Sequence, residues 1–596
     1  MTTDQNYQQI YRVGGMLDAG FVGQITYTIS LDQVYDELDI HFSFDKRLYS
    51  ESDVTPELID RLQTLCTAKY DAPTYPVEEF RQTILHEMKT EIHTMAELND
   101  NFIGCIHRQL TDRHMLYTKE FTSDGCLAQD TFSGVLKVTV LVFNVLLDNT
   151  QYTLTVSGHP VGQGVIAPNF NLMDTVKTAA GNAGASNAAG SADNSCEAES
   201  APASAVATAG SSGASGAGSA ATAGDSGVSG AGSAATAGDS STTGSSSAGN
   251  TIIASTRFKR LELHNHTVES DGSLTCQELT EYLAADHVDA FAITDHNTTS
   301  GQKKIEQLLE EKHYPISLIR GMEYTTYFGH ILCLNLAKYV PWNSIDQHRP
   351  ELLFEAAREK GALVGIAHPF SYGDPFARGC RFEMTISDYS KVDFIEIFNN
   401  PEPIHEVNER GTNLWMSLIF SGYQITATSG MDLHNRAKLA GCYVTYIEGK
   451  NGGNIASELD TAIHTHRTWV SKGALLLTEV LPETNELLLT FTDAHKPGFA
   501  VPKTAQVVLK GKDKTFTTSV SLDKPVRVSL NQLSGTDPII PLLYEAASDS
   551  CVNAAAASTS CSNTADASSA AGQLKGIDAL PAIEGLLCVS PVLYRD

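Results

Sequence analysis

Apolar and polar positions alternate along this chain in a pattern that changes sharply near residue 257. Beyond that point, short apolar runs are followed by amphipathic stretches: RLELHNH precedes CQELTEYLAADH, and DAFAITDH precedes GQKKIEQLLEEKH. The alternation continues through ISLIRGMEYTT, GHILCLNL, RPELLFEAAREKG, ALVGIAHPF, VDFIEIFNN, the stretch 404–421 and YQITATSGMDLH. Alternating strands and helices are typical of a parallel α/β architecture, either an open sheet or a barrel.

The N-terminal pattern is instead that of β-strands. The runs ELDIHFSF and SGVLKVTVLVFNVLLDNTQYTLTVSG are rich in β-branched and aromatic residues, with a turn signal at DNT. Between them, 56–69 and 77–98 have helical composition. We therefore expect residues 1–177 to form a β-rich accessory domain with a helical insertion. Three histidines of this domain lack partners at ligand spacing and are interpreted as packing or surface residues: His41, His86 and His93.

Two low-complexity segments divide the rest of the chain. Residues 178–250 are almost entirely Ala, Gly, Ser and Thr, and SGAGSAATAGDS occurs there twice without a large apolar residue on which a repeat could stack. This composition predicts a flexible linker. The shorter tract 546–572 predicts a surface-loop insertion within a C-terminal region, 478–596, whose alternating pattern favours a small β-sandwich.

Composition narrows the class of protein. The 596 residues include 41 basic and 70 acidic side chains, a formal net charge of −29, which opposes general attraction to nucleic-acid backbones or anionic membranes. The eleven cysteines never form a C-x-x-C pair, so neither a disulfide framework nor a thiolate zinc site is indicated, and Cys333 and Cys442 are expected to be buried. With no secretory signal and no run of about 18 apolar residues, we expect a cytoplasmic protein.

Ligand-type residues gather at the ends of the apolar runs in the α/β region. They are His264, His266, Asp271, His296, Glu323, His330, His368, Asp432 and His434. In barrels, catalytic residues lie at the carboxyl ends of the strands, and only His330 departs from this placement by opening its strand. Nine such residues, five of them in H-x-H, T-D-H and D-x-H clusters, indicate one metal centre rather than separate packing residues.

The chemistry of these residues favours several ions. In an extended strand His264 and His266 point the same way and can both bind one ion. Imidazole and carboxylate ligands suit Zn, Mn and Fe. Six histidines and three carboxylates exceed the needs of one ion, so we expect two or three, bridged by a carboxylate such as Glu323 or Asp432. The expected nucleophile is a metal-bound hydroxide.

The motifs also resemble a known family. LHNHTVESDG, AITDHNTTSG, GMEYTTYFGHILCLN, GIAHPF and SGMDLH, in this order, resemble the polymerase-and-histidinol-phosphatase (PHP) family of metal-dependent hydrolases. The seven-residue step from Glu323 to His330 and the run RTWVSKGALL are similar to the CehA/McbA-like branch. The resemblance covers about 257–477 and implies a distorted (β/α)7 barrel over 251–477, flanked by the N- and C-terminal β-domains.

The resemblance also implies a grouping of the ligands. His264 and His266 would share an ion with Glu323 and Asp432. A second ion would be held by Glu323, His330 and His368. The third would be bound by Asp271, His296 and His434. Met431, which stands where a small residue often precedes the Asp-x-His pair, would narrow the pocket.

The expected activity is hydrolysis of a phosphoester or phosphodiester by two or three divalent ions. Small-molecule phosphoesters, nucleotides and esters are the expected substrates, and Arg378, Arg436 and Asn399 are candidates for contacting them. Cleavage of a carbamate or carboxylic ester on the same site is the first alternative. An amidohydrolase barrel and a non-catalytic metal-binding interaction protein are the others.

Overall fold

The computed structural model describes most of the chain outside the two low-complexity tracts. The described ranges are 7–70, 76–145, 149–161, 175–178, 257–346, 348–373, 376–399, 406–450, 452–495, 500–533, 537–546 and 583–594. The predicted linker 178–250 and the predicted insertion 546–572 lie outside these ranges, apart from residues 178 and 546. The described residues form a mixed α/β structure with three sheets, and the expected α/β class is confirmed at this level.

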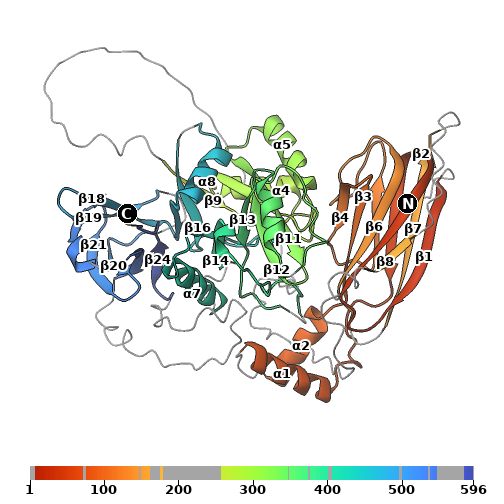
Figure 1. The fold of residues 1–596 in the computed structure, drawn as a ribbon, viewed down its shortest axis with the longest axis horizontal. Helices are drawn as coiled ribbons and strands as arrows, with labels where there is room; N and C mark the ends of the chain where they lie inside the picture. Colours follow the sequence, from red (N-terminus) through yellow and green to blue (C-terminus); the bar gives the residue numbers. More distant parts are fainter. Residues whose placement is uncertain are drawn as a thin grey trace, which may run out of the picture.

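An eight-stranded antiparallel sheet forms the N-terminal part of the structure (Figure 1). The strand order is β1-β7-β2-β6-β3-β4, and β5 and β8 pair with β2. Its strands are β1 (Gln8–Leu17), β2 (Gly23–Phe44), β3 (Glu91–Leu98), β4 (Asn101–Ile106), β5 (Asp112–Tyr117), β6 (Phe132–Asn144), β7 (Thr150–Pro160) and β8 (Thr175–Thr178).

The long strand β2 organises this sheet. Its first half, from Gly23 to Tyr35, pairs with β6, while its second half, up to Phe44, pairs with β7 and β5. Alternate side chains of both halves, such as Ile29 and Ile40, are buried in one apolar cluster together with Val138 and Leu154. The sheet therefore encloses its own core, as the period-2 pattern of the sequence requires.

The helical insertion is shorter than the composition predicts. Helices α1 (Pro56–Tyr70) and α2 (Val77–Glu87) confirm its presence, but the prediction of helix over 77–98 is wrong for its second half, which forms β3. This strand pairs on one side with β4 and on the other with β6, and seven of its eight residues are buried. Burial between two strands overrides the helical propensity of its Glu, Met, Ala and Leu residues.

Strands and helices alternate in the central part, as the sequence predicts. The strands β9, β10 and β11 are parallel, β12 runs antiparallel to both β11 and β13, and β13, β14 and β15 are again parallel. The strands are β9 (Arg257–Glu262), β10 (Ala290–Ile293), β11 (Ser317–Thr326), β12 (Gly329–Leu334), β13 (Leu363–Ile366), β14 (Phe394–Asn399) and β15 (Thr426–Gly430). Next to β9, β16 (Val444–Gly449) pairs antiparallel with it, and the Thr445 hydroxyl donates to the Ser429 carbonyl of β15. A closed seven-stranded barrel remains a prediction.

Helices connect these strands. They are α4 (Cys276–Ala285), α5 (Ser300–Lys312), α6 (Glu351–Arg358), the short η3 (Tyr389–Lys391), α7 (Glu406–Phe420) and α8 (Ile455–His464). Helix α4 begins with a capping box, in which Thr275 accepts from the Glu278 amide and the Glu278 carboxylate accepts from the Thr275 amide. The sequence T-x-x-E before the apolar positions of this helix explains where it begins.

The C-terminal strands continue the central sheet. Strand β17 pairs with β16 and β24, and the order continues through β23, β20 and β21, while β18, β19 and β22 form a separate sheet. Both sheets share one apolar core that includes Trp469, Leu489 and Leu543. The strands are β17 (Thr468–Ser471), β18 (Ala474–Leu481), β19 (Glu486–Asp493), β20 (Thr504–Lys510), β21 (Thr515–Ser521), β22 (Val526–Ser529), β23 (Ile540–Glu545) and β24 (Leu586–Val589), with η4 at Leu530–Leu533.

The N-terminal sheet packs directly on the central part. One apolar cluster contains Met95, Cys105 and Phe143 of the N-terminal strands together with central residues such as Tyr324 and Trp342. Cys333 and Cys442 are buried, as predicted, and the cysteines within the described ranges are all free. None of the helices in the described ranges is long and apolar enough to cross a membrane.

Candidate metal centre

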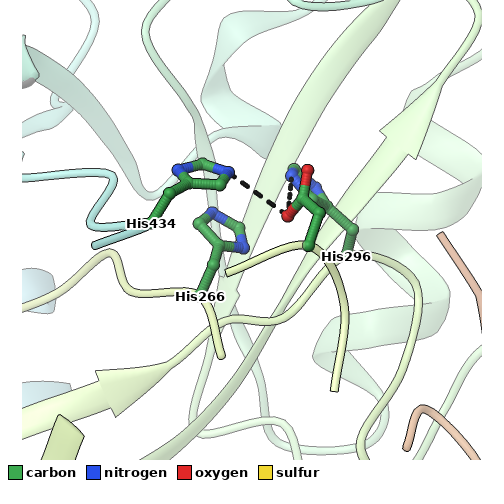
Figure 2. Close-up of side chains that lie close together, drawn as sticks. His266, His296 and His434 are labelled. Carbon is green, nitrogen blue, oxygen red and sulfur yellow. Dashed lines mark ion pairs between the residues drawn. The ribbon is translucent and has the colours of Figure 1, made fainter. Parts of the chain in front are cut away.

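The nine ligand-type residues converge on one region of the central sheet. His264 and His266 follow β9, His296 follows β10, and Asp432 and His434 follow β15. Backbone bridges from Asn265 to Leu433 and from His296 to Glu323 extend the parallel pairing just beyond the strand ends. Figure 2 shows the imidazoles of His266, His296 and His434 pointing toward one another from three separate segments. The parallel strands therefore gather residues that are up to 170 positions apart in the sequence.

The carboxylate of Glu323 lies at the middle of the cluster. Its Oε1 is 2.8 Å from His330 Nδ1 and 3.0 Å from His368 Nε2. Its Oε2 approaches three further imidazoles at 3.0–3.3 Å, those of His264, His266 and His296. Glu323 is fully buried, so this carboxylate bridges both parts of the cluster.

Asp432 makes the second carboxylate contact with the histidine pair after β9. Its Oδ1 lies 2.9 Å from His266 Nε2 and 3.4 Å from His264 Nε2. Donor atoms of these three residues and Glu323 all lie within 4.8 Å of one another. The structure thus brings together the four residues expected to share the first ion.

A second and a third group surround this one. Asp271 Oδ1 lies 3.3 Å from His434 Nε2 and 3.7 Å from His296 Nε2, and donor atoms of these three residues and His266 fall within 4.8 Å. His296, Glu323 and His330 form the other compact set. His368 lies 3.0 Å from Glu323, on the side where it was expected. The groups share His266, His296 and Glu323, which suits closely spaced ions.

Unpartnered polar atoms test whether a metal fits this arrangement. Buried polar atoms are normally hydrogen bonded, because an unpaired one costs free energy. Seven ligand-type atoms of the cluster have no hydrogen-bond partner among the described residues: His264 Nε2, His266 Nδ1 and Nε2, Asp271 Oδ1, Glu323 Oε2, His330 Nε2 and Asp432 Oδ1. Lone pairs of imidazole and carboxylate that face one another without hydrogen bonds fit divalent cations of the Zn, Mn or Fe type.

The charges of the cluster are strongly coupled. Burial alone would raise the pKa of Glu323, but the His264 and His330 imidazoles hold it well below its ordinary value. Burial would lower the pKa of His434, yet the Asp271 carboxylate raises it to about 10. Asp432 behaves like Glu323, with its pKa held well below the usual range by His264 after the opposing effect of burial. The carboxylates are thus anionic at neutral pH, as metal ligands must be.

Solvent reaches the cluster from one side. The side chains of His264, His266 and Glu323 are fully buried, whereas those of His434 and Asp271 are 32% and 27% exposed. Asp432, at 23%, is the third partly open residue. A substrate would approach from the partly exposed side of the cluster, where Asp271, Asp432 and His434 lie.

Backbone strain and a close approach mark the same segments. His368 and Asp432 have positive φ angles of 23° and 50°, a region that residues other than glycine rarely occupy and that costs about 1–3 kcal/mol each. Gly430 ends β15 directly against His264, where an added Cβ would lie 2.4 Å from His264 Cβ and 2.7 Å from Glu396 Oε1. Glycine is therefore required for β15 to pass beside the histidine pair.

Several supporting residues were not identified from the sequence. Glu396 accepts from His264 Nδ1 at 3.1 Å and from the His368 amide at 3.0 Å, and Asn399 Nδ2 donates to it at 2.9 Å. Asp295 accepts bonds from Thr267 and Ser270, which shape the loop leading to Asp271. An acidic residue within the apolar run FIEIF was the available signal, since a buried charge requires a partner.

The three expected substrate contacts have different surroundings. Asn399 is buried and bonds Glu396, behind the histidines. The guanidinium of Arg436 lies 5.9 Å from the ring centroid of Tyr282 on α4. Arg378 precedes Gly379, whose backbone lies close to the metal centre. A Cβ added at Gly379 would be 3.7 Å from His330 Nε2. Met431 is buried, and its side chain packs in an apolar cluster with Phe291 and Leu433.

The N-terminal sheet reaches the cluster with one histidine. His107, just after β4, places Nε2 3.4 Å from Asp271 Oδ2 and stacks its ring 4.1 Å from that of His296. Burial lowers the pKa of His107 to about 4. Arg108 Nη2 donates to the Gly272 carbonyl at 3.2 Å, and the Gly125 amide donates to Glu269 at 3.0 Å. The loop carrying Asp271 is therefore held by the N-terminal domain as well as by the central sheet.

Comparisons with known proteins match parts of the chain. Residues 7–160 match a family of unknown function (DUF6669). A 5'-3' exoribonuclease of Haemophilus influenzae is 36% identical over 141 residues, which are 22% of this chain and 50% of that protein. This chain therefore spans half the length of that relative.

Two solved structures show a partial likeness. One is a two-domain Bacteroides vulgatus protein containing a predicted PHP-like metal-dependent phosphoesterase, with 15% identity and a TM-score of 0.29 over 48% of this chain and 90% of the other. The second, from Bifidobacterium adolescentis, is described as a metal-dependent phosphoesterase, with 20% identity and a TM-score of 0.22 over 30% of this chain and 89% of the other.

Proposed function

We propose that this chain is a metal-dependent hydrolase of the PHP type that cleaves phosphoesters, with the CehA/McbA-like branch as its nearest resemblance. The observation that carries the proposal is the Glu323 carboxylate surrounded by five imidazoles, with Asp271 and Asp432 beside them and unpartnered donor atoms facing inward. We assign all nine residues as ligands of two or three divalent ions.

Neighbouring residues orient the ligands, and the carboxylates supply negative charge. Glu396 accepts from His264 Nδ1, which leaves Nε2 of that imidazole free to bind, and a partner of this kind fixes the tautomer and the ring orientation. Glu323 and Asp432 supply the negative charge that several cations require. When bound, the ions would acidify a water molecule and neutralise charge that develops on the phosphoryl group. Bound substrate would lie at the open border formed by Asp271, Asp432 and His434.

The substrate class is supported by chemistry and by one relative. Several clustered divalent cations suit an anionic phosphoryl group, whose oxygens they can clamp on both sides. The Haemophilus influenzae relative is named as an exoribonuclease, which acts on phosphodiesters. A phosphomonoester, a phosphodiester and a 5'-phosphorylated oligoribonucleotide are therefore the first substrates to compare.

The test is metal-dependent turnover of two chromogenic esters. Chelator-stripped protein is supplied with Mn²⁺ or Zn²⁺ and assayed on bis(nitrophenyl) phosphate and on nitrophenyl acetate. We expect the phosphodiester to be cleaved only with added metal. Cleavage of the acetate alone would contradict the phosphoesterase proposal and would support a carbamate or carboxylic-ester hydrolase instead.

A matched histidine pair controls for folding. His266→Ala should abolish turnover, whereas His464→Ala should not, because the His464 side chain is 56% exposed and contacts Asp460 one helical turn away. Equal activity of the two variants would contradict the assignment of the centre. If metal is retained without any turnover, the non-catalytic metal-binding protein becomes the better description.

A further inference from the structure

The N-terminal sheet carries its own buried group of ligand-type residues beside the metal centre. Glu91 and His93 lie on β3, and His107 and Gln109 follow β4. They are between 0% and 7% exposed. Side chains two positions apart on a strand share a face, so Glu91 and His93 face the same way as Met95, whose sulfur accepts from the Tyr339 hydroxyl of the central part. The group therefore lies at the junction between the sheet and the metal centre.

The contacts within this group are in conflict when no ion is present. His93 Nε2 lies 3.2 Å from Glu91 Oε1 and 2.8 Å from the amide nitrogen of Gln109. If His93 Nε2 accepts from Gln109, it presents a lone pair to the Glu91 carboxylate. If it donates to Glu91, it meets the donor hydrogens of Gln109. One nitrogen cannot satisfy both neighbours.

Buried atoms of the group also lack partners. His93 Nδ1, His107 Nδ1 and Gln109 Oε1 have no hydrogen bond among the described residues. The ring centroids of His93 and His107 are only 4.0 Å apart. Unpaired buried polar atoms cost free energy, so two adjacent imidazoles, a carboxylate and a free amide oxygen form an unfavourable group unless a ligand binds there.

We propose that Glu91, His93 and His107 bind a divalent cation. Donor atoms of the first three residues lie within 4.8 Å of one another. Two ligands at about 2.0–2.1 Å from a tetrahedral ion are separated by about 3.3 Å, close to the 3.2 Å between Glu91 Oε1 and His93 Nε2. Two imidazoles and one carboxylate favour Zn²⁺ and similar ions.

This ion links the two parts of the molecule. His107 contacts both the N-terminal group and, through Nε2, Asp271 of the metal centre. An ion held by Glu91 and His93 therefore fixes the His107 ring against His296 and orients the loop that carries Asp271. The site does not rest on the proposed hydrolysis, because none of its three residues belongs to the ligand set of the central sheet.

Charge makes Glu91 the decisive residue. Arg113 lies close enough to the group for its positive charge to act on His93, and it opposes a second cation there. The Glu91 carboxylate offsets this charge, and it is 6% exposed. Replacing the carboxylate by an amide of the same shape should therefore remove the ion with little change in packing.

The experiment counts metal in the full chain. Wild type, Glu91→Gln and the control Glu79→Gln, which changes an exposed residue of α2, are stripped, reloaded with Zn²⁺, desalted and measured by elemental analysis. We expect Glu91→Gln to bind one ion fewer per chain than wild type and Glu79→Gln to bind the wild-type number. Equal binding by all three proteins would overturn the proposal and leave a hydrogen-bonded group.

Anomalous scattering at the zinc edge locates the ion even if Glu91→Gln fails to fold. A peak in wild-type crystals between Glu91, His93 and His107 supports the site, and peaks confined to the residues around Glu323 refute it. Phosphodiester turnover of the same preparations separates the two hypotheses. An ion at Glu91 without turnover would contradict only the proposed function, whereas turnover without that ion would contradict only the additional site.

Discussion

The central sheet and the N-terminal sheet present the same ligand types in different ways. In the central sheet, most of the histidines and carboxylates follow strand ends, and they surround Glu323, which lies within β11. In the N-terminal sheet, Glu91 and His93 lie within a strand and act from its face. Strand ends offer one shared edge, while a strand face acquires a partner only where another part of the molecule packs on it.

The difference explains how each group is stabilised. Around Glu323 the ligands contact one another and are supported from within the central part by Glu396 and Asp295. The N-terminal group also depends on docking, because His107 contacts Asp271 and His296, and Met95 on the same strand face packs in an apolar cluster with the central part. The first group should therefore respond to changes in its own charges, and the second to changes at the junction.

The largest effect is expected at the middle of the central cluster. Glu323→Gln keeps the shape of the side chain but removes the negative charge that faces five imidazoles. We expect metal-dependent phosphodiester turnover to fall about a thousandfold or more, about 4 kcal/mol in barrier height. Steady-state rates measure this, with Glu311→Gln on an exposed position of α5 as the control. If Glu323→Gln lost no more turnover than Glu311→Gln, the charge of Glu323 would not be what stabilises the central cluster.

Disruption of the junction should be nearly as costly. Phe143 is fully buried, and its ring lies 4.4 Å from that of His93 and 4.7 Å from that of Tyr327. Phe143→Ala should lower the free energy of unfolding by about 3–5 kcal/mol, the usual cost of removing a buried aromatic ring. Urea unfolding measures it against Phe121→Ala, whose side chain is exposed. If the two variants had the same free energy of unfolding, packing at the junction would not contribute to the stability of the protein.

A smaller effect is expected at the residue behind the histidines. Glu396→Gln leaves every assigned ligand in place but weakens the contacts to His264 Nδ1 and the His368 amide. Removal of such a supporting partner lowers metal affinity or activity by about 10–100-fold. Competition with a chelator gives the affinity. An unchanged affinity would mean that the orientation of His264 is set by packing alone.

The pH dependence of metal binding should separate the two groups further. The Asp271 carboxylate raises the pKa of His434 to about 10 against the opposing effect of burial, so the ion-free imidazole is protonated at pH 7. A ligand must be neutral, and an ion that binds there must release this proton. Affinity should therefore rise about tenfold per pH unit for each proton released, up to about pH 10.

Metal binding by His107 should not depend on pH in this way near neutrality. Burial lowers its pKa to about 4, so this imidazole is already neutral at pH 7 and releases no proton. Calorimetry of metal binding in buffers with different ionisation enthalpies measures the number of protons. Binding without proton release at pH 7 would contradict the protonated state of His434.

The sequence was sufficient for the elements that carry the metal centre. Eight of the nine residues lie in a strand or close behind its end, Asp271 lies in the loop between β9 and α4, and the order of the strands follows the alternation of the pattern. This local information includes the antiparallel β12, where His330 opens the strand as expected. The proximity of the nine residues followed because parallel strands end at one edge.

The contribution of the N-terminal sheet could not be predicted in this way. The run from Glu91 to Leu98 contains good helix formers, and only its pairing with β4 and β6 makes it a strand. His93 has no partner at ligand spacing in the sequence, so nothing local distinguishes it from an ordinary histidine. His107 and Asp271 are separated by 164 positions, and no spacing rule connects two residues that meet only when separate parts of a chain dock.

The most direct test of the central claim is a combined measurement of metal content and turnover on one double variant. His266→Ala with Asp432→Ala removes two residues that contact each other at 2.9 Å and belong to the group expected to hold the first ion. We predict that this protein, reloaded with Mn²⁺ or Zn²⁺, binds fewer ions per chain than wild type and no longer cleaves bis(nitrophenyl) phosphate. A double variant that kept both its metal and its activity would contradict the account.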